Sequence, residues 1–95
     1  LGGIYLKLVK FSARNINSKT NIEKEYHINL DQITYVKIEH NSISIFFSNG
    51  DGLYKHFELN SSKLNEEGYV IPKSEDELEK EITESLESLG IEIIR

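Results

Sequence analysis

The chain has 95 residues, a mass of 10.9 kDa and a formal net charge of −5 at pH 7. This length predicts a single domain over residues 1–95, and the acidic balance disfavours general nucleic-acid binding. The absence of cysteine excludes a disulfide scaffold, a thiolate zinc site and a cysteine nucleophile. Leu, Ile, Val and Phe supply 30 of the 95 residues. That share is far above the roughly 20% below which a charged chain stays disordered, so we expect a small folded core.

The sequence also indicates where the protein acts. No apolar run is long enough to span a membrane, and no basic start followed by an apolar stretch indicates a secretory signal. We therefore expect a cytoplasmic protein. The heavy use of Ile, Asn, Lys and Glu is typical of an AT-rich bacterial genome, which favours a bacterium or one of its mobile elements as the source.

The first part of the chain predicts a β-hairpin with a long tip. Residues 4–11 are rich in β-forming side chains without a turn residue, which predicts a strand. Residues 12–21 are polar and contain three Asn, which predicts a loop. Residues 22–28 alternate, with Ile22, Tyr26 and Ile28 on one face of a second strand.

The middle of the chain predicts a three-stranded meander over residues 33–39, 42–47 and 53–59. A turn at His40 and Asn41 separates the first two strands, and the Asn-Gly and Asp-Gly pairs of residues 48–52 separate the last two. Residues 60–73 are expected to be mostly loop, with a short strand at 68–71. The strand-rich part therefore covers residues 4–71.

Residues 74–89 predict a helix that packs on this sheet. Ser74 and Glu77 form the Ser-x-x-Glu pattern of a capping box, and Gly90 suits the position just past the helix end. Ile91 would then pack back on Leu86 as in a Schellman motif, with residues 91–94 as a short tail or strand. At about 100° per residue, four apolar side chains fall on one narrow stripe of this helix: Leu78, Ile82, Leu86 and Leu89. Such a stripe needs a surface to cover it.

The predicted fold class is therefore α+β. We expect a strongly bent, mainly antiparallel sheet or partly open barrel of five to seven strands, covered by one C-terminal amphipathic helix. An edge strand such as residues 4–11 could pair between subunits, which would give a homodimer.

Charge is distributed unevenly along the chain. The predicted helix carries seven acids and one Lys, whereas residues 1–22 contain four cations and no acid. Three of these cations, Lys10, Arg14 and Lys19, bracket the polar tip of the first hairpin. They predict a weak, salt-sensitive contact with a phosphate or an acidic segment of a protein partner. The alternative is single-stranded nucleic acid on the same hairpin, with Tyr5 or Tyr26 stacking on bases.

Enzymatic and metal-dependent functions are not favoured by any motif. The phosphate-binding, nucleophile-elbow and zinc-protease patterns are absent from the sequence. His27, His40 and His56 could meet on one outer surface with Glu23 or Glu25, but their spacing does not require it. We therefore predict no catalytic residue, no bound metal and no cofactor.

The middle strands resemble those of bacterial PH-like or GRAM-like domains. The resemblance covers residues 22–90 and is carried by Ile28-x-Leu30-Asp31-x-Ile33-x-x-Val36-x-Ile38, by residues 42–47 and by Asn49-Gly50-Asp51-Gly52. It implies seven strands, a helix that closes one end of the sheet, and a lipid-headgroup or protein-binding function with Lys10 and Arg14 at the basic positions of the first hairpin. A bacterial source argues against polyphosphoinositides. The strand-turn-strand sequence is also similar to that of LytTR-type DNA-binding domains. The acidic net charge of the chain argues against this second resemblance.

Together these observations predict a small non-catalytic binding or accessory module. It would contact a protein partner or an anionic group through the basic first hairpin. An RNA- or single-stranded nucleic-acid-binding regulator is the alternative function.

Overall fold

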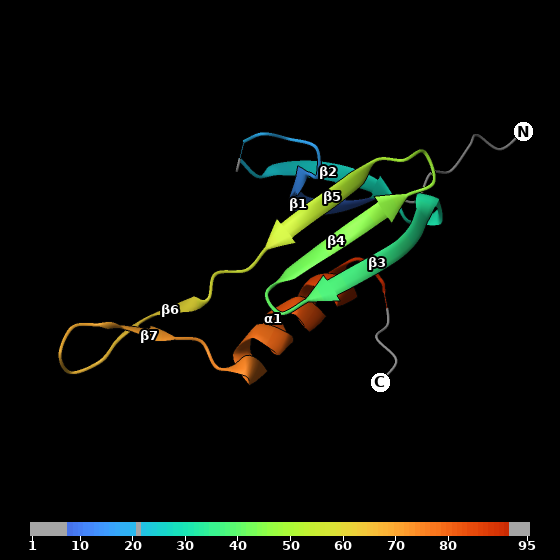
Figure 1. Cartoon of the computed structure of the whole chain (residues 1–95). Coiled ribbons are helices and arrows are strands. Elements are labelled where there is room, and N and C mark those ends of the chain that lie inside the picture. Colours follow the sequence, from blue (N-terminus) through green and yellow to red (C-terminus); the bar gives the residue numbers. More distant parts are fainter. Residues whose placement is uncertain (1–7, 21, 92–95) are drawn as a thin grey trace, which may run out of the picture.

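The computed structural model describes residues 8–20 and 22–91 of the chain. This part contains seven strands, arranged in two antiparallel sheets, and one C-terminal helix (Figure 1). The α+β class is thus confirmed. The elements are β1 (Leu8–Asn15), β2 (Lys24–Asn29), a 3-10 turn (Leu30–Gln32), β3 (Ile33–Glu39), β4 (Ser42–Phe47), β5 (Gly52–His56), β6 (Asn60–Leu64), β7 (Val70–Pro72) and α1 (Glu75–Ser88).

The larger sheet has the strand order β2-β1-β5-β4-β3 and is not closed into a barrel. It joins the predicted β1–β2 hairpin to the predicted β3–β4–β5 meander, and both are confirmed. The joint between the two is narrow, because β1 pairs with β5 only at Arg14 and Asn15. Before that point β1 pairs with β2 alone, from Leu8 to Ala13.

One prediction about the first strand is wrong. The loop expected from Ser12 begins only after Asn15, because Ala13 is fully buried and holds the polar stretch in the ladder. In the edge strand expected at residues 4–11, residues 8–11 pair with β2 on one side and with no described strand on the other, because β5 meets β1 only at Arg14 and Asn15. Pairing between subunits along this edge stays a prediction. Residues 4–7 of that prediction lie outside the described residues.

The core lies between the inner face of the sheet and α1, as predicted. Ile43 and Ile45 of β4 and Leu86 and Leu89 of the helical region are fully buried, and all four residues of the predicted stripe face this core. The other buried apolar side chains come from β1, β2, β5 or its end, and α1 (Phe11, Ala13, Ile28, Leu53, Phe57, Leu78 and Ile82).

Both ends of α1 are formed as the sequence predicts. The Ser74 hydroxyl accepts a hydrogen bond from the Glu77 N–H at 3.2 Å. At the other end Gly90 has φ +77°, and the N–H of Ile91 donates to the Leu86 carbonyl at 3.0 Å, which completes a Schellman motif. No helix among the described residues has the length and apolar character needed to cross a bilayer. Residues 92–94 lie outside the described part.

The segment predicted to be mostly loop contains a second sheet. Strands β6 and β7 pair into a two-stranded ribbon, residues 60–72, here called the arm. The Asn65 side-chain oxygen accepts from the N–H groups of Glu67 and Tyr69, each at 2.9 Å, and this closes the tip. Figure 1 shows the arm projecting from the body of the molecule, whose extents are 65 × 32 × 22 Å.

Candidate binding site

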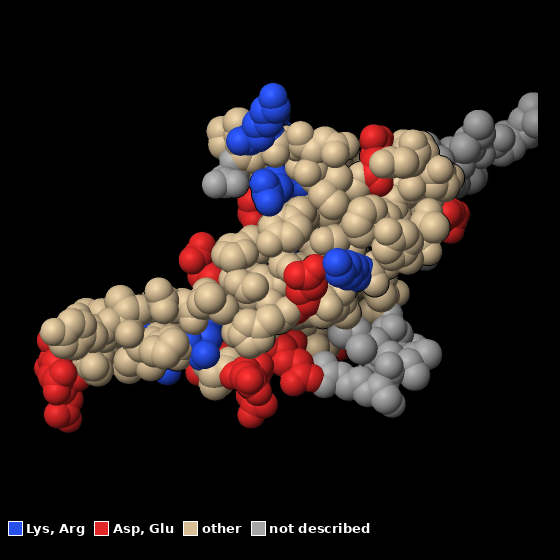
Figure 2. All heavy atoms as spheres, in the orientation of Figure 1, with Lys and Arg blue, Asp and Glu red and all other residues tan. Residues whose placement is uncertain are grey.

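The predicted cations Lys10 and Arg14 are held by a strand rather than by a flexible tip. Both project from the outer face of β1, because the intervening Phe11 and Ala13 are buried on the inner face. Lys19 follows in the exposed turn between β1 and β2. Figure 2 shows Lys and Arg side chains gathered at this end of the molecule, whereas acidic side chains gather near α1 and at the tip of the arm.

Strand pairing brings acids to this hairpin, which reduces its positive charge. Ser12 lies opposite Glu25 in the ladder, and the Glu25 carboxylate is 3.9 Å from the Lys10 ammonium. Both side chains are exposed, so this ion pair is weak and an incoming anion can replace it. The turn after β1 is closed by its own side chain, because the Asn15 side-chain oxygen accepts from the Asn17 N–H at 2.9 Å.

Arg14 is fixed by an aromatic ring at the joint of the two sheet halves. It lies opposite Tyr54 in the β1–β5 ladder, and its guanidinium carbon stands 4.5 Å from the centre of the Tyr54 ring. The ring attracts the guanidinium and restricts where the side chain lies. This geometry suits the planar, two-oxygen recognition of a carboxylate or phosphate.

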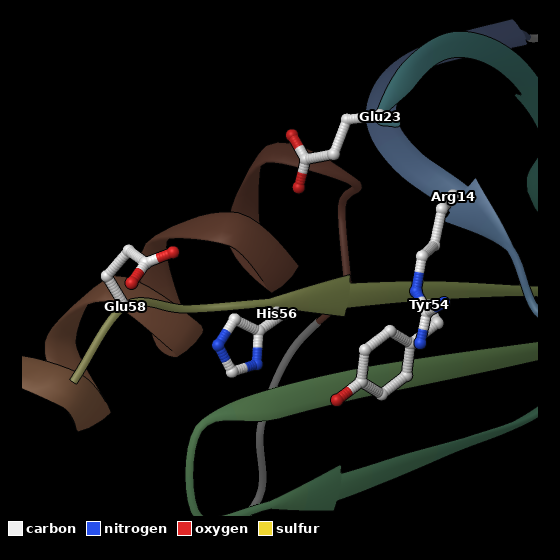
Figure 3. A pocket seen from close by; sticks show the side chains of 5 residues that line it. All are labelled: Arg14, Glu23, Tyr54, His56 and Glu58. Carbon is white, nitrogen blue, oxygen red and sulfur yellow. The ribbon is translucent and has the colours of Figure 1, made fainter. Parts of the chain in front are cut away.

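A hollow of about 530 Å³ opens beside Arg14 on the outer surface. It lies where β1 and β5 separate, since the two strands pair only at Arg14 and Asn15 and the earlier residues of β1 pair with β2 alone. Figure 3 shows Arg14 reaching from β1 towards Tyr54, with Glu23 and Glu58 on the other sides and His56 on β5. The hollow therefore offers a cation for an anionic group and two carboxylates for hydrogen-bond donors.

Lys55 bridges the gap where the two strands separate. Its ammonium donates to the Ser12 carbonyl at 2.9 Å and lies 3.8 Å from the Glu23 carboxylate. It also stands 5.6 Å from the Phe11 ring centre and 5.8 Å from that of Phe57. Sequence reasoning did not assign a role to this residue, although a lysine alternating with Leu53 and Phe57 on an apolar face was a signal that could have found it.

The three histidines are not brought together. His56 lines the hollow, His27 is exposed on β2, and His40 is exposed in the β3–β4 turn. Within residues 8–20 and 22–91, no group of three or more His, Asp or Glu side chains is placed to hold a metal ion.

The aromatic residues considered for base stacking are not presented by the hairpin. Tyr26 is half-buried and packs against the core, and Tyr5 lies outside the described residues. Exposed tyrosines lie elsewhere: Tyr69 is at the arm, and Tyr35 on β3 stacks on Phe46 with ring centres 4.5 Å apart. A flat basic and aromatic surface is therefore not formed by the described part of β1 and β2.

No protein-family model, no curated protein and no solved structure matches this chain. The candidate site therefore stands on its own geometry.

Proposed function

We propose that the protein is a small, non-catalytic, cytoplasmic binding module that holds an acidic segment of a protein partner on the outer face of its first hairpin. Arg14 provides the main contact, with Lys10 on the same strand face and Lys19 in the adjoining turn. The stacking of Arg14 on Tyr54 at the rim of the hollow is the observation that carries this proposal. An oriented guanidinium loses less side-chain entropy when it binds a carboxylate.

The acids of the hollow favour a protein over a nucleic acid. Glu23 and Glu58 would repel the closely spaced phosphates of an RNA strand, but they can accept hydrogen bonds from the N–H groups of a peptide. The partner segment should therefore carry carboxylates for Arg14 and Lys10 together with backbone or side-chain donors for the two acids. Because the site is open, we expect a modest affinity that falls with salt.

We also propose that the fold is PH-like and that the source is a bacterium or one of its mobile elements. Two observations support a PH-like fold: one C-terminal helix packs on the inner face of an antiparallel sheet, and cations project from the first hairpin.

A binding assay with charge-reversal variants tests this function. Fluorescence anisotropy would measure the affinity of a labelled Glu-rich peptide for the full chain and for K10E/R14E. We expect the variant to bind at least about tenfold more weakly, a loss of about 1.4 kcal/mol. The matched control is K37E/K80E, which reverses two exposed cations on β3 and α1 and should leave the affinity of the peptide nearly unchanged.

Equal binding by the wild-type chain and K10E/R14E would overturn the proposal. A gel-shift with single-stranded RNA at roughly 50 and 300 mM salt tests the alternative function, because RNA affinity should fall steeply over this range. RNA binding that is tighter than peptide binding and is lost in K10E/R14E would favour that alternative.

A further inference from the structure

The arm exposes apolar side chains that nothing in the described part of the molecule covers. Leu64 and Val70 lie opposite each other in the ladder and therefore share one face of the ribbon, with exposed fractions of 61% and 49%. Tyr69 and Ile71 alternate with Val70 and so face the other side, at 68% and 38%. A two-stranded ribbon alone is only marginally stable in water, so a partner that covers one of these apolar faces would stabilise the arm.

The tip of the arm has the opposite charge to the first hairpin. Glu66 and Glu67 are exposed in the tip turn, whereas Lys10, Arg14 and Lys19 mark the hairpin. Figure 2 shows the acidic tip and the basic end of the molecule well separated within one copy. The two charged ends can therefore meet only between copies while the fold is kept.

The hairpin also carries an apolar residue that could receive the arm. Ile22 is 64% exposed and immediately precedes Glu23, which lines the hollow. The ring of Tyr54 forms part of the same hollow. The arm therefore combines acidic and apolar side chains, and the hairpin combines basic and apolar side chains. The two surfaces are complementary in charge, and each offers apolar groups to the other.

We propose that the partner of the first hairpin is a second copy of this chain, whose arm packs across the hairpin and the hollow. Glu66 and Glu67 of one copy lie beside Arg14 and Lys19 of the other, and Tyr69 and Ile71 cover Ile22. Because each copy has one arm and one hairpin, a two-fold exchange closes as a dimer and forms both contacts at once. Two equal contacts bury twice the surface area of one. This brings the buried area closer to the roughly 1,200–2,000 Å² of stable interfaces. The inference rests on the proposed function and names its partner.

Oligomeric state and compensating charge reversal test the dimer. Analytical ultracentrifugation of the full chain, from roughly 1 µM to 1 mM, should show a concentration-dependent dimer. E66K/E67K and R14E/K19E should each raise the dimer dissociation constant at least about tenfold. The combined variant E66K/E67K/R14E/K19E should restore much of the loss, because the charges are exchanged between the two surfaces.

Two further variants separate the arm from general effects of charge and folding. E84K/E87K changes the net charge by the same amount on the exposed face of α1 and should leave the dimer intact. L64S/Y69S removes one apolar side chain from each face of the arm and should abolish the dimer. Its body should still unfold cooperatively, because no arm residue belongs to the buried core.

The outcomes distinguish this inference from the proposed function. A chain that is monomeric at all concentrations, or a dimer that E66K/E67K does not weaken, overturns the inference. If that monomer still binds the Glu-rich peptide through Lys10 and Arg14, the proposed function stands without it. If the chain neither dimerises nor binds the peptide, both proposals fail.

Discussion

Lys55 shows how one residue can join two parts of a sheet. Its side chain is 20% exposed, and its ammonium supplies a donor to the Ser12 carbonyl, on the side of β1 where β5 no longer pairs. The two phenylalanine rings nearby provide an electron-rich surface for the cation. The residue thus satisfies a backbone group that strand pairing leaves open, and it positions Glu23 at the hollow.

Replacing the charge of Lys55 tests this role. Lys55→Met keeps the length of the side chain but removes the ammonium, which leaves the Ser12 carbonyl without this donor. We expect the free energy of unfolding to fall by about 1–2 kcal/mol, measured by urea denaturation. Lys37→Met is the control, because its exposed pair with Glu39 should contribute less than about 0.5 kcal/mol. Equal stability of the two variants would contradict the role of Lys55.

At the scale of elements, α1 and the arm differ in how they are stabilised. The apolar stripe of α1 is buried against the sheet, and its capping bonds are local to the chain. The arm has local bonds at its tip but lacks buried apolar side chains. Packing therefore stabilises α1 in a single copy, whereas the arm depends on its own ladder or on a partner.

Truncation at the centre of the stripe measures the contribution of α1. Leu86 is fully buried, so Leu86→Ala should lower the free energy of unfolding by about 2–5 kcal/mol through lost burial and the cavity that remains. Urea denaturation monitored by circular dichroism gives this value. Glu87→Ala, at the adjacent exposed position, should change it by less than about 0.5 kcal/mol. A loss below about 1 kcal/mol for Leu86→Ala would show that α1 is not part of the core.

At the scale of the whole molecule, the structure divides into a packed body and a projecting arm. The body holds the core between the five-stranded sheet and α1, and the arm projects from it (Figure 1). Because local stability follows burial, the two parts should open independently in a dilute, monomeric sample.

Amide hydrogen exchange tests this division. In a dilute sample the amides of Ile43 and Ile45 should exchange only through global unfolding, whereas those of β6 and β7 should exchange with little protection. At concentrations where the dimer forms, the protection of the arm should rise and that of β4 should change little. Arm amides as protected as those of β4 in the monomer would be inconsistent with an independent arm.

The α+β class, the meander, α1 and both helix ends followed from the sequence because their signals are local. The capping box and Gly90 act within one turn of the helix, and the alternation of β4 fixes which face is buried. The position of the three cations in the first hairpin also followed from the sequence. The polar β6 has no alternating apolar pattern, which is why the sequence indicated a loop there.

The surroundings of those cations depend on contacts between segments that are distant in the sequence. Lys55 and Ser12 are 43 residues apart in the chain, and the hollow combines Arg14 with Tyr54, His56 and Glu58 from a distant strand and its end. Such neighbours depend on where β1 stops pairing with β5, and no local pattern encodes that point. Side-chain type and period are properties of the sequence, whereas a binding surface depends on which distant segments share an edge.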